Sequence, residues 1–196
     1  MKQASLIVVG FLMLLSCQTG SISRKLTEVD SLVFKEEYDS AYQMISSIDE
    51  TTIKNQEDQA HYNLLKVQTG YLANKPAASP DSLLDEVIDY YQKEGNAEKL
   101  ADAYYYKAYC SFLNKDMELS ILFHKKAEES AKISNNKRIQ FKIYEGISFM
   151  NSKCANYGLQ LEYALPTRKN EYAIHFLLFS CFAISKAFFA YSNCKP

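Results

Sequence analysis

From Glu28 onward, apolar residues recur at intervals of three and four residues, and clusters of polar residues interrupt them. This spacing is typical of amphipathic α-helices, and no stretch sustains the two-residue alternation of a β-strand. The pattern therefore predicts an all-α fold. We expect four antiparallel helix hairpins, over residues 24–49, 55–94, 97–134 and 137–165.

The second hairpin has clear boundary signals. Its first helix is expected to end near Asn74, because Pro76 interrupts the segment that follows. Residues 80–82, which begin with a proline, are suited to the start of a second helix over 83–93. Gly95 then predicts the end of that helix.

The third hairpin shows small and aromatic residues on matching faces of two helices. These residues are Ala103, Tyr104, Ala108 and Phe112, then Met117, Ser120, Ile121, His124 and Ala127 after a turn at 114–116. Helices approach to about 8–10 Å only where the side chains between them are short. We therefore expect the small residues at the helix crossing and the aromatic rings beside it.

This pattern resembles the tetratricopeptide repeat. Ala108, Ser120 and Ala127 match the small positions of that repeat, and Asp116-Met117 stands where an acidic and an aromatic residue usually open the second helix. The resemblance implies a right-handed superhelical stack of hairpins, an α-solenoid, whose inner face binds a protein or peptide partner without catalysis.

Weaker copies of the same pattern flank the third hairpin. Glu37-Tyr38 precedes it, and Asn156-Tyr157 follows it. Asn156 lies 40 residues after Asp116, which exceeds the usual period of about 34 residues, so the helices here are expected to be long. The repeat region predicted in this way covers residues 24–165.

The amino terminus has the composition of a secretory signal peptide. Lys2 is followed by an apolar run over residues 6–15 and then by Cys17. About ten apolar residues are too few to span a bilayer core of about 30 Å, so residues 1–16 are expected to be a removable signal rather than part of the fold.

The four residues that end at Cys17 resemble a bacterial lipobox, in which the cysteine sulfur receives a diacylglyceryl group before cleavage on its amino side. Cys17 is therefore the expected lipid attachment site, with residues 17–23 as a polar linker to the folded domain. An ordinary signal peptide that contains a cysteine is the alternative. The resemblance implies an exported protein, lipid-anchored in the cell envelope at the periplasmic or outer-membrane face.

Residues 166–196 depart from the repeat pattern. Pro166 falls where the second helix of a repeat should continue, and the run 172–191 is strongly apolar and aromatic. Three interpretations stay open. The run is a transmembrane helix, although His175 and Lys186 are unfavourable in a bilayer, or it is a final helix packed on the preceding hairpin, or it is a truncated or aberrant end of the chain.

Composition excludes several classes of function. The 22 basic and 23 acidic residues give a formal charge of −1, which argues against a nucleic-acid partner. No phosphate-binding loop, metalloprotease motif, serine-hydrolase motif or EF-hand spacing occurs. We therefore expect no enzyme activity, no cofactor and no metal.

The cysteines, histidines and adjacent acidic residues of the predicted helices are expected to have structural rather than catalytic or metal-binding roles. Cys110 and Cys154 lie on apolar helical stretches and are expected to pack as buried thiols. His61 and His124 are expected in a core or groove rather than as metal ligands. Adjacent acids such as Glu128-Glu129 are expected on solvated helix faces.

Tyrosines concentrate on the first helix of the third hairpin. Successive side chains on a helix are about 100° apart, so Tyr104, Tyr105 and Tyr106 cannot all be buried. Together with Tyr109 and His124 they are the candidate contacts of a peptide-binding groove, the alternative being that most of them pack between helices.

A second function is compatible with the sequence besides that of a scaffold. The chain could be the periplasmic sensor input domain of a longer membrane-spanning signalling or transcription-regulating protein, here truncated.

Overall fold

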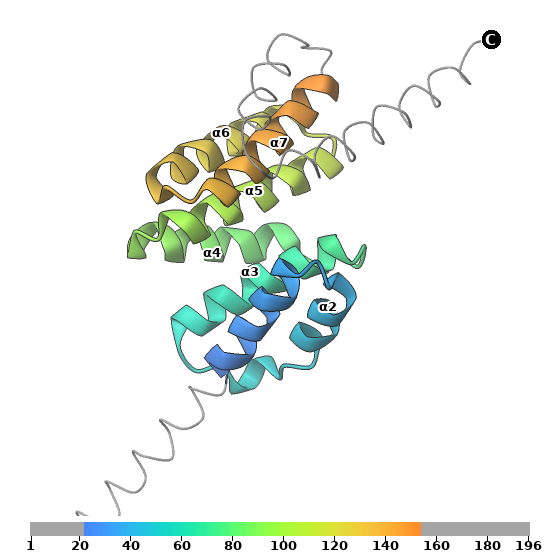
Figure 1. The fold of residues 1–196 in the computed structure, drawn as a ribbon, viewed down its shortest axis with the longest axis vertical. Helices are drawn as coiled ribbons and strands as arrows, with labels where there is room; N and C mark the ends of the chain where they lie inside the picture. Colours follow the sequence, from blue (N-terminus) through green and yellow to red (C-terminus); the bar gives the residue numbers. More distant parts are fainter. Residues whose placement is uncertain (1–21, 154–196) are drawn as a thin grey trace, which may run out of the picture. The chain divides into compact units, whose positions relative to one another are not determined.

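The computed structural model describes residues 22–153, and these residues form helices and connecting turns without any strand (Figure 1). A helix over 22–34 comes first. It is followed by α2 Tyr38–Ser46, the short 3₁₀ helix η1 Glu50–Thr52, α3 Gln56–Leu72, α4 Pro80–Glu94, α5 Ala97–Leu113, α6 Met117–Ser134 and α7 Lys137–Lys153. The all-α prediction is confirmed for this part of the chain.

The helix boundaries follow the local chemistry of the sequence. The side chain of Asn55 caps α3 by accepting a hydrogen bond from the backbone N–H of Asp58 at 2.7 Å. Pro80 occupies the first position of α4, where its missing N–H costs nothing. Gly95 ends α4 in the left-handed conformation, with φ of 70°. The end of α4 at Gly95 is where the sequence predicted it, whereas the helix begins at Pro80 itself, three residues before the predicted start at 83.

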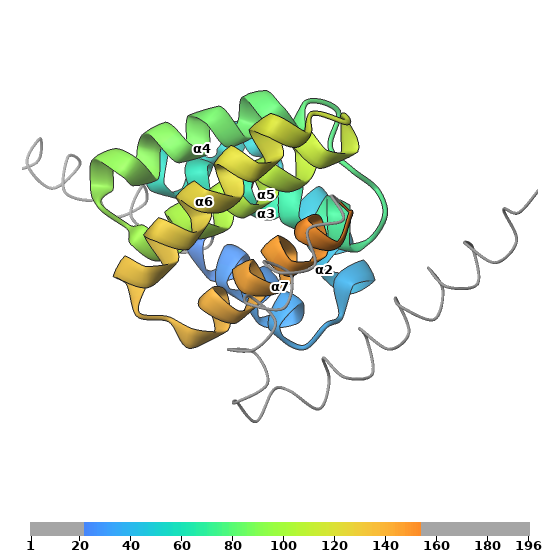
Figure 2. The same ribbon diagram turned by 90° about the horizontal axis from the view of Figure 1, so that it is seen from above.

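The chain divides into two compact units, with the boundary between Ser134 and Asn135. In the first unit, α2 packs on α3, α3 on α4, α4 on α5 and α5 on α6, and α3 also contacts α5 (Figures 1 and 2). In the second unit, α7 buries one face, which carries Ile139, Ile143, Ile147 and Met150.

Two groups of buried residues hold the first unit together. One, here called the N-terminal core cluster, contains Leu26, Val29, Ala41, Ile45, Ile48, Ile53, Tyr62 and Leu65. The other lies where α5 meets α6, and the short side chains of Ala108, Ser120 and Ala127 are fully buried there. The Ser120 hydroxyl donates to the Ala108 carbonyl at 2.8 Å. The predicted small residues are thus buried in the two helices that cross.

Two predicted side-chain positions are wrong. Ile121 is 47% exposed rather than on the packed face of α6. Glu128 is buried rather than solvated, and Lys132 at 2.8 Å and Lys125 at 3.4 Å pair with its carboxylate. Glu128 lies one helical turn after buried His124, and this places it on the buried face, where flanking lysines compensate its charge.

Several predictions fall on residues outside those described. They are the signal peptide 1–16, the lipid site Cys17 with residues 18–21 of its linker, the repeat start at Asn156-Tyr157, Cys154, and the apolar segment 166–196. Residues 22 and 23 of the predicted linker lie in the helix over 22–34. Among the helices over residues 22–153, none combines the length and the apolar character that a bilayer crossing requires.

Candidate functional site: an aromatic surface on α3 and α5

Aromatic side chains from α3 and α5 form a continuous cluster. Tyr71, in the last turn of α3, stacks on Tyr106 of α5 with ring centroids 6.4 Å apart and an interplanar angle of 6°. Tyr71 also meets the ring of Tyr109 edge-on, at 5.2 Å and 88°. Both geometries are favourable for aromatic pairs. The cluster is therefore built across two helices that are not consecutive in the chain.

The cluster extends along one stripe of α5. Tyr105, Tyr109 and Phe112 are spaced four and three residues apart, which places them on one helix face. The Tyr109 and Phe112 rings lie 6.5 Å apart, and Tyr105 meets Tyr106 edge-on at 5.2 Å. We call Tyr71, Tyr105, Tyr109 and Phe112 the aromatic surface.

The structure separates the tyrosines that the sequence grouped. Tyr104 and Tyr106 are buried, Tyr105 is half-buried, and Tyr109 is 36% exposed. Tyr104 takes no part in the aromatic surface, because it stacks instead on Phe123 of α6 at 6.2 Å. The expectation that three consecutive tyrosines cannot all be buried agrees with the half-buried position of Tyr105.

Sequence reasoning did not include Tyr71 and Phe112 among the candidate contacts. The stripe formed by Tyr105, Tyr109 and Phe112 is a signal that could have identified Phe112, since the spacing is visible in the sequence. Tyr71 has no such signal, because its place beside α5 depends on how α3 packs against that helix.

A polar contact lies beneath the aromatic surface. The Tyr71 hydroxyl and the Cys110 thiol are 2.9 Å apart, and Cys110 is a buried free cysteine. Burial raises the pKa of the Cys110 thiol to about 11 and also raises the pKa of Tyr71. Both groups are therefore uncharged at neutral pH, and Cys110 packs as the small apolar residue that the sequence predicted.

His124 lies next to the same surface, in the interior. It is 5% exposed, its ring meets Tyr105 edge-on at 6.0 Å, and its Nδ1 is 2.9 Å from the Ser120 carbonyl. The Nδ1–H group donates a hydrogen bond to that carbonyl. Burial lowers the pKa of His124, so the neutral ring is favoured in the fold. This position is not open to a ligand.

His124 should make the folding free energy depend on pH. In the unfolded chain the ring takes up a proton near its ordinary pKa of 6.5, whereas in the fold it does so only at lower pH. The stabilisation is complete above pH 6.5 and is lost as the pH falls below it. We expect His124→Phe, which removes the titrating group, to reduce the loss of stability between neutral and mildly acidic pH. Urea unfolding on both sides of pH 6.5 measures this, and equal acid sensitivity in the two proteins contradicts it.

A charged cluster connects the first helix with α3 and α5. His61 Nε2 lies 2.8 Å from Asp30 Oδ2 and 2.9 Å from Lys99 Nζ. Burial alone would raise the pKa of Asp30, but the hydrogen bond from His61 and the charge of Lys99 hold it below its usual value. The cluster has the character of an ion-pair network between helices. Within residues 22–153, no group of three or more histidines, cysteines and carboxylates is arranged to hold a metal ion.

Comparison with known proteins adds no further assignment. A scan against protein-family models, a search of curated proteins and a search of solved structures each found no match to this chain.

Proposed function

We propose that this chain is a non-catalytic scaffold that binds a protein or peptide segment on the aromatic surface. The observation that carries the proposal is the pair formed by Tyr71 and Tyr109, which meet edge-on at 5.2 Å while Tyr109 remains 36% exposed. Two rings from different helices thus present a rigid platform at the protein surface.

Tyrosine suits such a platform for physical reasons. Its ring offers a large contact area with few rotatable bonds, and its hydroxyl can form a hydrogen bond with a partner. Aromatic residues are enriched in the binding-energy centres of protein interfaces. The Tyr109 ring contacts the rings of both Tyr71 and Phe112, and this restricts its motion, so little conformational entropy is lost when a partner contacts it.

The arrangement of helices supports the same proposal. Consecutive helices pack on one another from α2 as far as α6, and α3 also contacts α5, although α4 lies between them in the chain. In the proposal this order continues as a superhelical α-solenoid, with α3 and α5 on the surface that faces the partner. The protein would act in the cell envelope, anchored through a lipid on Cys17.

Selection of random peptides against the full chain tests the proposal. We expect enriched peptides to lose at least about tenfold in affinity when Tyr109 is replaced by alanine, the loss typical of a central aromatic contact. Tyr90→Ala is the matched control, because Tyr90 is a partly exposed tyrosine on α4 outside the aromatic surface. Enrichment of no peptide, or equal losses in the two variants, contradicts the proposal.

A further inference from the structure

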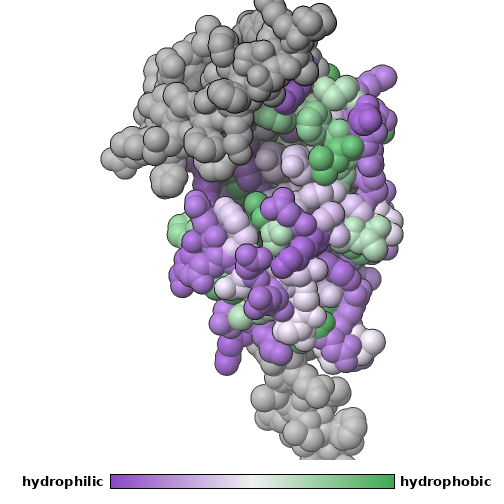
Figure 3. Space-filling model, turned by 90° about the vertical axis from the view of Figure 1, so that its right-hand side faces the viewer, coloured by the Kyte–Doolittle hydropathy of each residue, from purple (hydrophilic) through white to green (hydrophobic). Residues whose placement is uncertain are grey.

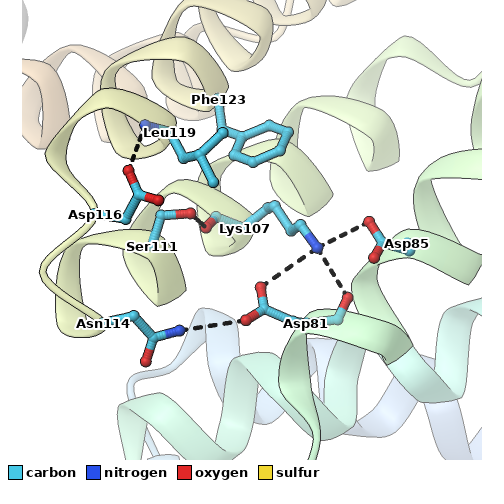
Figure 4. A pocket seen from close by; sticks show the side chains of 8 residues that line it. All are labelled: Asp81, Asp85, Lys107, Ser111, Asn114, Asp116, Leu119 and Phe123. Atoms are coloured by element: carbon cyan, nitrogen blue, oxygen red, sulfur yellow. Dashed lines mark hydrogen bonds and ion pairs between the residues drawn. The ribbon is translucent and has the colours of Figure 1, made fainter.

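A second surface feature, separate from the aromatic surface, is a pocket formed by α4, α5 and α6 (Figure 4). Its volume is about 330 Å³, at the lower end of the range for ligand pockets and suited to one or two side chains. The pocket is lined by Asp81, Asp85, Lys107, Ser111, Asn114, Asp116, Leu119 and Phe123. These residues supply a charged wall and an apolar wall.

Lys107 forms the floor of the charged wall. It is a buried lysine whose Nζ lies 2.8 Å from Asp85 Oδ1, 3.3 Å from Asp81 Oδ1 and 3.1 Å from the Asp81 carbonyl. Its ammonium is fully engaged by these oxygens, as Figure 4 shows. The lysine therefore neutralises one carboxylate and is not itself available to an anionic ligand.

Negative charge remains after this pairing. Three aspartates and one lysine give the lining residues a formal charge of −2. One oxygen of Asp85 contacts Lys107, and one oxygen of Asp116 accepts the backbone N–H of Leu119 at 3.0 Å. Within residues 22–153, the second oxygen of Asp85 and of Asp116 accepts no hydrogen bond from the protein. Two charged acceptors are thus open at the pocket.

The opposite wall is apolar. Leu119 is 42% exposed there and lies beside Phe123, and the neighbouring Leu122 is exposed as well. The ammonium groups of Lys107 and Lys126 lie 5.8 and 5.6 Å from the Phe123 ring. The open oxygens of Asp85 and Asp116, rather than the Phe123 ring, therefore favour a further cation, while Leu119 offers contact to an apolar group. In the face of the molecule that Figure 3 shows, hydrophobic residues form separate patches among the hydrophilic residues.

We propose that this pocket binds an arginine side chain of a partner peptide, with an apolar residue of the same peptide against Leu119. We choose a cationic side chain because the lining residues have a net negative charge and because one oxygen each of Asp85 and Asp116 is open to a donor. The guanidinium has five donors in a planar fork, which matches carboxylate oxygens better than an ammonium does. The side chain of such a peptide also fits the volume of the pocket.

A pair of synthetic peptides tests the inference on the full chain. The first is a fluorescent peptide in which arginine lies between two leucines, and the second carries citrulline, a neutral residue of the same shape, in place of arginine. We expect the arginine peptide to bind about tenfold more tightly, since its hydrogen bonds to carboxylates are charge-assisted. Fluorescence anisotropy at low ionic strength measures both affinities. Equal affinities, or no binding of the arginine peptide, overturn the proposal.

Variants assign the binding to the pocket. Asp85→Asn should weaken the arginine peptide about two- to fivefold and leave the citrulline peptide unchanged, because Asp85 is exposed and screened by water. Leu119→Ala should weaken both peptides about fivefold through lost apolar contact. Glu94→Gln, the same loss of charge on α4 outside the pocket, is the matched control.

Tyr109→Ala separates this site from the aromatic surface, and it should leave the affinity of the arginine peptide unchanged. Thermal unfolding of each variant verifies that it is folded. A folded Asp85→Asn variant that binds both peptides as the parent does overturns the proposal, as does a loss of binding in Tyr109→Ala. Failure of the arginine proposal and failure of the scaffold proposal can be told apart, because the scaffold proposal is tested with peptides that are selected without regard to arginine.

Discussion

Replacement of Leu65 by alanine is expected to lower the free energy of unfolding by about 2–5 kcal/mol. Leu65 is fully buried in α3, within the N-terminal core cluster that joins α3 to the helix 22–34 and to α2. The truncation removes apolar contacts on several helices at once and leaves a cavity that the surrounding backbone can fill only in part. Urea unfolding followed by circular dichroism measures the change.

Leu122→Ala is the matched control for this prediction. It is the same substitution on a helix, but Leu122 is 47% exposed on α6, so we expect a change within about 0.5 kcal/mol. If the two variants lose similar amounts of stability, Leu65 is not at the centre of a packed core. The described arrangement of α3 between the N-terminal helices and α4 would then be wrong.

Replacement of Ala108 by leucine should destabilise the protein by about 1–3 kcal/mol through overpacking. Ala108 is fully buried on α5, and its carbonyl accepts the Ser120 hydroxyl at 2.8 Å, so the two helices lie close at this point. Alanine and leucine both favour the helical state, and helix propensity therefore contributes little to the change. The loss measures the space available between α5 and α6.

Ala97→Leu makes the corresponding change at the first residue of α5, where the side chain is only half-buried. We expect its unfolding free energy to stay within about 0.5 kcal/mol of the parent. Equal stability of Ala108→Leu and the parent protein would show that short side chains are not required at the helix crossing. The steric basis of the resemblance to the tetratricopeptide repeat would then be lost.

The candidate sites were partly accessible to sequence reasoning. The tyrosines of α5 stand out by their number, and helical geometry alone requires that some of them leave the core. Which of them do so could not be predicted, because Tyr104 and Tyr105 differ only in the neighbours they meet. Tyr104 faces Phe123, whereas Tyr105 faces Tyr106 and His124.

The pocket at Lys107 had no sequence signal at all. Its charged groups come from α4, α5 and the turn before α6, and Asp81 and Lys107 are 26 residues apart. From sequence alone, a lysine on a helix is predicted to be solvent-exposed, since an unpaired charge is costly to bury. Only the packing of α4 on α5 brings Asp81 and Asp85 close enough to make the burial of Lys107 tolerable.

The sequence by itself determined the helices and their ends, because hydrophobic period, caps, proline and glycine act within a few residues of the chain. Pro80 and Gly95 delimit α4 for that reason. The tertiary structure decided which side chains are buried or presented at the surface. Lys107 and Tyr109 owe their environments to residues on other helices, and such contacts have no fixed spacing in sequence. Glu128 is paired with lysines of its own helix, at spacings that the sequence shows, but its burial depends on the packing of α6.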